Sequence, residues 1–357
     1  MNKDWEKIEK YYLAWWNCEV LDKVAIKVEV PPDKSQLESL DTGSVADRFN
    51  KGKVIKYNEE IIHRFFCGGF AFFKYWPNFG PDVFSGYMGA TLEFSPLGSY
   101  PVSWVDWNKP ILKDYSDLSA LEIKEDNFYW QKTKEFTSYA LERAQGHYLV
   151  GITDLHAGMD SLAVLRGGPE KVCMDLFDNP DGVKKAMKLL WKAWHKVHEE
   201  SCKIIAKKQR GTCSWMGGIW SPGKMYAVQN DFTCLISTKM YEEFFLEEIL
   251  NEINYLDHSV YHLDGPDALK HLDMLLEIPR LNAIQWVPGA GLVKEGVAKW
   301  MPIYKKIQSK KKAVIVYCKP NEINFVLDNL SSKGLMISTV CSSQQEAEEL
   351  LQHYGWN

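Results

Sequence analysis

The sequence predicts an α/β fold, a (β/α)8 TIM barrel that occupies residues 1–357 as a single domain. Short apolar runs alternate with amphipathic helical segments through the second half of the chain. These runs are almost continuously apolar, which is typical of parallel strands covered by helices on both faces. No GxGxxG motif follows an early strand, so the sequence favours a barrel over a doubly wound open sheet.

Eight strand–helix units make up the predicted barrel. The first strand, 23–30, follows an N-terminal amphipathic helix. The other strands are expected to begin near residues 148, 213, 232, 259, 282, 313 and 335. Helices are expected at 155–166, 180–208, 239–255, 266–277, 293–308, 321–330 and 343–353, with one short helix opening at Pro169. Pro180 near the start of the longest helix and a Ser343/Glu346 capping box support these boundaries.

Residues 31–147 fit the barrel pattern less well. They contain Pro31-Pro32, a predicted helix at 57–66 and a Trp- and Gly-rich stretch at 75–107. We interpret that stretch as an elaborated βα loop, with a short hairpin pair, that covers the barrel mouth. The predicted barrel therefore has an N-terminal helical extension and an elaborated loop over its mouth.

The composition is that of a globular protein and argues against several functional classes. Lys and Arg number 42 and Asp and Glu 47, which gives a formal net charge of −5 without any basic block. We therefore expect no nucleic-acid partner. No apolar stretch reaches about 18 residues and no signal peptide is recognisable, so we expect no membrane association and a cytoplasmic location. The eight cysteines are irregularly spaced without a CxxC pair, which indicates reduced thiols.

Metal-capable side chains stand where two predicted strands end. His262 and Asp264 are separated by one residue, so in a strand they point to the same side. Cys341 ends the 335–340 strand. Imidazole, carboxylate and thiolate together predict a catalytic zinc site with an open fourth position. Alternatively, Asp264 caps the next helix and Cys341 is a packed thiol, and Cys318 is a rival ligand.

A second candidate pair is Asp154 and His156, which follow the strand that begins near 148. As a catalytic pair they could orient a substrate or transfer a proton, although His156 could instead begin the next helix. Asp231 also stands near a strand, but it precedes the predicted 232–236 strand, which favours a structural role. His195 and His198 lie in the middle of the long helix and are expected on the surface.

Aromatic and amide side chains at other strand ends are candidates for substrate binding. They are Trp215, Trp220, Gln285, Trp286 and Tyr317. Converging rings could bind a quaternary ammonium group through cation–π attraction, or stack on a pterin or corrinoid ring. The alternative interpretation is that these rings fill the core.

Several segments carry, through their order and spacing, a resemblance to a known superfamily. They are Gly151–Asp154, Leu165–Glu170, Tyr261–Gly265, Asn282–Trp286 and Val314–Cys318. They resemble barrels of the uroporphyrinogen decarboxylase-like superfamily, over residues 148–357 more than over the N-terminal part. The resemblance implies the same (β/α)8 fold.

Within that superfamily, the pattern is closest to the zinc-dependent corrinoid methyltransferases. The Arg-Gln-Ala-Gly-Arg-Tyr segment of the decarboxylases is absent, and Val28–Pro32 stands in its place. The methyltransferases bind zinc through His-x-Cys on a middle strand and a Cys on the last strand. His262 matches that His and Cys341 matches the last Cys, while Asp264 replaces the middle Cys.

The resemblance implies a zinc-dependent methyltransferase of one-carbon metabolism. The methyl group would move between a corrinoid protein or methylated small molecule and a thiol or tetrahydrofolate, with zinc as cofactor. A homodimer is compatible with the aromatic surface. Two alternatives stay open: a metal-independent decarboxylase or lyase with Asp154 or Asp264 as its acid, and a non-catalytic protein that binds a small molecule or corrinoid.

Overall fold

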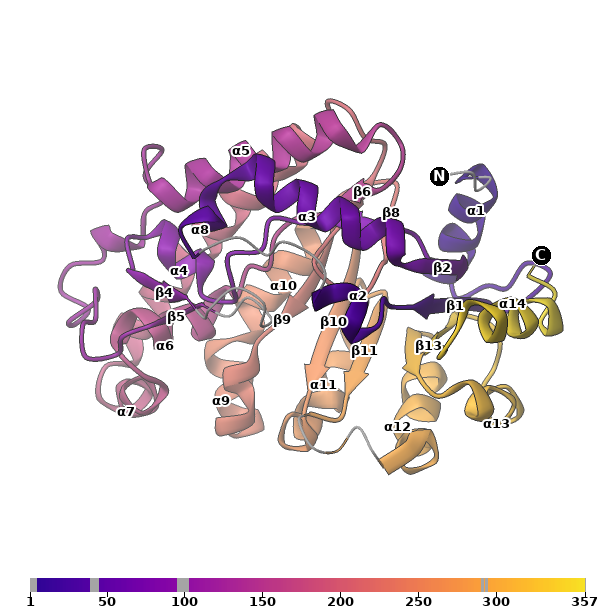
Figure 1. Ribbon diagram of the computed structural model, residues 1–357. Helices are drawn as coiled ribbons and strands as arrows, with labels where there is room; N and C mark the ends of the chain where they lie inside the picture. The colour runs from indigo at the N-terminus through magenta and orange to yellow at the C-terminus, as the bar shows by residue number, and fades with distance from the viewer. Residues whose placement is uncertain (1–4, 39–44, 95–102, 290–291, 293–294, 357) are drawn as a thin grey trace.

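The centre of the molecule is a seven-stranded, mostly parallel sheet (Figure 1). The computed structural model describes residues 5–38, 45–94, 103–289, 292 and 295–356. The strand order is β2-β1-β13-β12-β11-β10-β9, and every pairing except the antiparallel β1–β2 is parallel. The strands are β1 (Ala25–Val30), β2 (Phe66–Gly69), β9 (Met225–Gln229), β10 (His258–Asp264), β11 (Ala283–Val287), β12 (Ala313–Tyr317) and β13 (Leu335–Val340).

Shorter strands extend this arrangement. β3 (Lys74–Tyr75) pairs in parallel with β6 (Leu149–Val150), and β7 (Thr212–Cys213) pairs antiparallel with β8 (Trp220–Ser221). A parallel bridge between Ile152 and Ser214 links the β6 and β7 segments. The predicted α/β class with a central parallel sheet is therefore confirmed. The ladders of the described residues do not form a closed ring, so barrel closure stays a prediction.

Helices cover the sheet, and Figure 1 shows α5 and α8 at the opposite end of the molecule from α12–α14. The longer ones are α1 (Trp5–Trp16), α3 (Lys51–Arg64), α5 (Phe128–Ala144), α6 (Gly158–Arg166), α7 (Pro169–Asp178), α8 (Pro180–Ile205), α10 (Leu246–Tyr255), α12 (Gly296–Ser309) and α14 (Gln344–His353). The shorter ones are α2 (Lys34–Glu38), η1 (Val45–Phe49), α4 (Val83–Tyr87), η2 (Ser119–Leu121), η3 (Asp231–Leu235), α9 (Thr238–Phe244), η4 (Pro266–His271), α11 (Leu272–Leu276), η6 (Pro320–Glu322) and α13 (Ile323–Asn329).

Local chemistry sets several of these boundaries. The Asn179 side chain accepts a hydrogen bond from the Gly182 backbone N–H at 3.0 Å and so caps α8, which begins at Pro180 as predicted. Ser343 caps α14 in the same way through the N–H of Glu346. At the N-terminus, α1 packs against the β7–β8 hairpin, because Trp16 donates its indole N–H to the Trp220 carbonyl at 2.9 Å.

The Trp- and Gly-rich stretch at 75–107 contains α4 and an antiparallel hairpin of β4 (Leu92–Phe94) and β5 (Ser103–Val105). The connection of that hairpin, 95–102, lies outside the described residues, as does the predicted start of a helix at 293. The predicted helix at 57–66 corresponds to α3, which begins earlier, at Lys51, and ends at Arg64, because Phe66 opens β2. Among the described residues, no helix combines the length and apolar character needed to cross a membrane.

One predicted strand is wrong. Residues 231–235 form the 3-10 turn η3, and the strand lies just before it, as β9. The reason is a competing acceptor: the Asp160 carboxylate accepts the backbone N–H groups of Asp231 at 2.9 Å and Phe232 at 2.7 Å. These two N–H groups are therefore not available for pairing with a neighbouring strand. Asp231 consequently follows a strand instead of preceding one.

Three further expectations need correction. The predicted helix at 155–166 begins at Gly158, so His156 lies in the loop before it. The predicted helix at 239–255 is divided into α9 and α10 at Phe245. His198 is not on the surface. It is fully buried, stacks on Trp194 with ring centroids 4.9 Å apart, and faces the Met225 carbonyl at 3.3 Å.

Candidate metal and acid–base site

The carboxyl ends of β9 and β10 bring a histidine and two aspartates together. His262 and Asp264 lie on β10, and Asp231 follows β9. One potential ligand atom from each of the three residues lies within 4.8 Å of the other two. The sequence-based expectation that His262 and Asp264 face one point is therefore met.

Strand register explains why Asp231 joins this group. Gln229 of β9 lies opposite His262 of β10. Two residues further on stand Asp264, the last residue of β10, and Asp231, which follows β9 at the start of η3. Because β9 and β10 are parallel, both carboxylates lie at the carboxyl end of this strand pair.

His262 is held in one orientation by its neighbour on β11. Gln285 lies opposite His262 in the β10–β11 register, and its side-chain oxygen accepts from His262 Nδ1 at 2.6 Å. The Gln285 amide donates in turn to the Tyr317 hydroxyl at 2.6 Å. Because Nδ1 carries the shared proton, Nε2 keeps a lone pair for an ion. The Trp215 ring packs edge-on against the imidazole, with centroids 5.4 Å apart.

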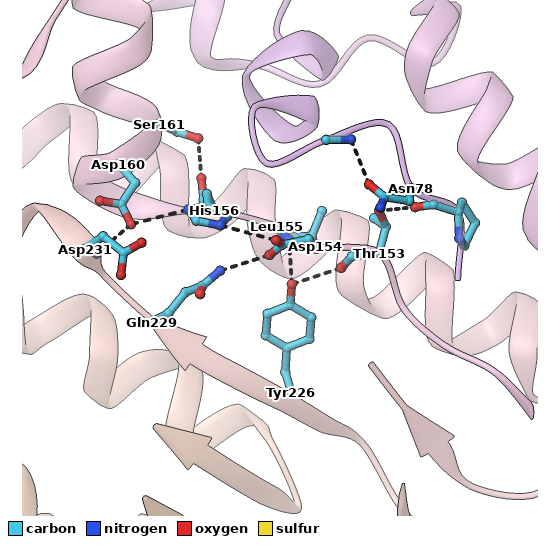
Figure 2. A network of polar contacts seen from close by, with 12 residues as sticks. Asn78, Thr153, Asp154, Leu155, His156, Asp160, Ser161, Tyr226, Gln229 and Asp231 are labelled. Atoms are coloured by element: carbon cyan, nitrogen blue, oxygen red, sulfur yellow. Dashed lines mark hydrogen bonds and ion pairs between the residues drawn. The ribbon is translucent and has the colours of Figure 1, made fainter. Parts of the chain in front are cut away.

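A second group lies beside the first and shares Asp231. Potential ligand atoms of His156, Asp160 and Asp231 also lie within 4.8 Å of one another. Figure 2 shows the His156 ring between two carboxylates, with Nε2 3.3 Å from Asp154 and Nδ1 3.8 Å from Asp160. The Gln229 amide donates to the other oxygen of Asp154 at 2.9 Å.

The charges of these groups shift one another. Burial alone would lower the pKa of His156, but Asp154 and two further carboxylates outweigh burial and raise it to about 10. With no ion bound, the imidazole is therefore protonated at neutral pH. Burial also raises the pKa of Asp160, with Asp231 as the next contribution. Burial raises the pKa of Asp264, and the nearby His262 opposes that rise.

The loop that carries Asp154 and His156 is tied down from several elements. The Tyr226 hydroxyl accepts the Leu155 N–H at 2.6 Å and donates to the Thr153 carbonyl at 2.9 Å (Figure 2). The Ser161 hydroxyl donates to the backbone carbonyl of His156. A loop that is bonded at successive residues can hold its functional side chains in one geometry.

The predicted third ligand, Cys341, does not belong to either group of ligand atoms that the described residues form. It follows β13, which is three strand positions from β10, and each position adds about 4.8 Å across the sheet. The thiol is buried, and burial raises its pKa to about 11. Cys318, the rival ligand, is likewise absent from both groups, and burial raises its pKa to about 12.

The five predicted substrate-binding residues divide into two sets. Trp215, Gln285 and Tyr317 form the surroundings of His262 described above. Trp220 is fully buried, and its ring contacts Trp5 and Tyr12 of α1. Trp286 is also fully buried and packs on Trp300 of α12. These last two rings fill the core, as the alternative interpretation proposed.

Two important residues were missed or undervalued by sequence reasoning. The sequence pattern favours a structural role for Asp231, because it predicts the neighbouring strand after that residue. Asp160 lies within a predicted helix, and no motif around it points to a function. The i,i+4 spacing of His156 and Asp160 was the available signal, although its weight depends on where α6 begins.

The residues fit a divalent first-row transition-metal ion. Two carboxylates and one imidazole are ligands that zinc accepts, and they equally suit manganese or iron. One oxygen of Asp264 is buried and has no hydrogen-bond partner, which is the arrangement expected of an atom that binds an ion. The ligand set is harder than the thiolate-containing set that the resemblance implied.

Comparison with known proteins adds no assignment: no family model matches the sequence, and no curated protein does. The likeness to uroporphyrinogen decarboxylase-type barrels therefore stays a prediction from sequence.

Proposed function

We propose that this protein is a divalent-metal-dependent enzyme whose ion is bound by Asp231, His262 and Asp264, and that its reaction is methyl transfer. The observation that carries the proposal is the convergence of these three ligand atoms within 4.8 Å at the carboxyl ends of two parallel strands. Catalytic residues of α/β barrels gather at this end. A (β/α)8 barrel is the proposed fold, supported by the β3–β6 pairing and the Ile152–Ser214 bridge.

The chemistry follows from the ligand set. When bound, zinc supplies Lewis acidity that lowers the pKa of a thiol or water in its open position. His262, oriented by Gln285, contributes the neutral nitrogen ligand, and Trp215 with Tyr317 offers aromatic surface to the substrate. Two carboxylate ligands balance the charge of a divalent ion, so the site has no excess negative charge that would repel an anionic thiolate.

The proposed transfer balances without a redox partner. The sulfur of the acceptor thiol forms a bond to the methyl carbon while the bond from that carbon to the donor breaks. The donor, a methylated corrinoid protein or small molecule, keeps the bonding pair. The thiol proton passes to water, which can reach the site beside Asp231, the exposed one of the three ligands.

The test combines metal analysis with turnover. Replacing His262 by Ala should remove the bound ion and abolish methyl transfer to a thiol or to tetrahydrofolate. His195→Ala is the matched control, because His195 lies on α8 among Trp191 and Tyr255. Full metal content and full turnover in the His262 variant would refute the proposal.

One observation favours a second function, a metal-independent lyase or decarboxylase. His156, protonated between Asp154 and Asp160, is a proton donor that needs no ion. In a decarboxylation the C–C bond would break, carbon dioxide would leave, and His156 would give its proton to the carbon that keeps the pair. Such an enzyme would keep full activity in a strong chelator, whereas the metal-dependent enzyme would lose it.

A further inference from the structure

We propose that the same site binds a second cation, held by His156 and Asp160, with the Asp231 carboxylate bridging the two ions. This inference rests on the proposed metal-dependent function and extends it to a dinuclear centre. The carrying observation is that Asp231 belongs to both groups of converging ligand atoms. A shared carboxylate is a common way of holding two metal ions about 3.5–4 Å apart.

The two histidines are held in the same manner. His262 has one ring nitrogen on Gln285, which leaves the other for an ion. His156 has Nε2 at 3.3 Å from Asp154, and its Nδ1 faces Asp160 at 3.8 Å. Histidines that bind metals usually donate the second ring N–H to a carboxylate or another acceptor, which sets the tautomer. Both imidazoles therefore have the outer contact that a ligand histidine needs.

Asp160 and Asp231 are also linked to each other. The Asp160 oxygens accept the backbone N–H groups of Asp231 and Phe232 at 2.9 and 2.7 Å, and each oxygen retains a further lone pair. Hydrogen-bonded carboxylates are typical of ligands held in place by their surroundings. The same contacts position Asp231 at the start of η3, between the two histidines, as Figure 2 shows for the His156 side.

The charge balance points to cations. Four carboxylates, those of Asp154, Asp160, Asp231 and Asp264, stand around two imidazoles. Within the described ranges, no lysine or arginine forms an ion pair with any of these four. With one divalent ion bound, two of the four negative charges remain, and a second divalent ion would balance them. Carboxylates that are at least partly buried, such as those of Asp154, Asp160 and Asp264, are normally paired or coordinate metals.

The experiment is a titration of the metal-free full-length protein with Mn(II), followed by metal analysis and electron paramagnetic resonance. We expect two ions per chain and the spectrum of a spin-coupled pair. Asp160→Asn and His156→Gln should each retain one ion and give the six-line spectrum of isolated Mn(II). Asp160→Asn preserves shape and an acceptor oxygen, and His156→Gln supplies an independent variant should the first fail to fold.

The outcomes separate this inference from the proposed function. One ion per chain in the wild type, lost in His262→Ala, would overturn the second site and leave the proposed function standing. Two ions without spin coupling would overturn the Asp231 bridge. No binding of Mn(II) or zinc would refute both. Two coupled ions, reduced to one by either variant on the His156 side, would support the dinuclear centre.

Discussion

Replacing Gln285 by Leu should weaken metal binding without removing any ligand. Leu has similar size and is compatible with a side chain that is 6% exposed. The substitution deletes the 2.6 Å contact that orients His262 and leaves its ring N–H without an acceptor. The Tyr317 hydroxyl also loses its donor, but Tyr317 is not one of the proposed ligands.

The magnitude follows from the role of the lost contact. Loss of an outer partner of a ligand histidine typically costs a factor of 10–100 in metal affinity, or about 1.4–2.7 kcal/mol. An unsatisfied N–H adds a cost of about 1–3 kcal/mol to the metal-free fold. We therefore expect the Kd for zinc, measured by competition with a chromophoric chelator, to rise about 10–100-fold.

The matched control is Gln229→Leu on the neighbouring strand. Gln229 lies opposite His262 in the β9–β10 register and undergoes the same chemical change, but its amide donates to Asp154. Its zinc Kd at the Asp231–His262–Asp264 position should change less than about threefold, because no ligand of that position loses a partner. A folded Gln285→Leu protein with the wild-type Kd would refute the assigned role of Gln285.

Three further outcomes are expected. Burial lowers the pKa of His198 to about 3, so between pH 6.5 and 3 the unfolded chain binds a proton at this residue and the folded chain does not. The free energy of unfolding should therefore fall by on the order of 1 kcal/mol for each pH unit below about 6.5. His198→Phe should flatten this slope in urea unfolding measured across that range. Tyr226→Phe should destabilise the fold by about 1–3 kcal/mol, since Leu155 loses the acceptor of its buried N–H, and an unchanged denaturation midpoint would contradict that contact. Zinc at 100 times its Kd should raise the free energy of unfolding by about 2.7 kcal/mol, and a melting temperature independent of zinc would argue against binding to the folded state.

The strands that sequence reasoning found share one property. The runs at 282–287, 313–317 and 335–340 are mostly apolar because nearly all of their strand residues are buried, so the signal is local. β9 is also buried throughout, yet the sequence pattern predicts a strand in the apolar run that follows it. The run after β9 is not a strand because its first backbone N–H groups donate to Asp160. Asp160 stands more than 70 positions earlier in the chain, so no local sequence pattern indicates this contact.

The candidate site shows the same division between local and long-range information. His262 and Asp264 could be paired from the two-residue period of a strand alone. Asp231 required the register of β9 against β10, which depends on both strands being placed correctly. Cys341 joins the predicted site through its place at a strand end and through a resemblance, whereas the sheet order puts it three strand positions from β10. Pairing within one strand is thus predictable, whereas convergence between strands depends on the fold.

The measurement that tests the central claim most directly is the zinc content of Asp231→Asn beside Cys341→Ala, on protein purified without an affinity tag. If Asp231, His262 and Asp264 bind the ion, Asp231→Asn should lose zinc relative to the wild type and Cys341→Ala should keep it. Loss of zinc from Cys341→Ala with full retention in Asp231→Asn would contradict the account.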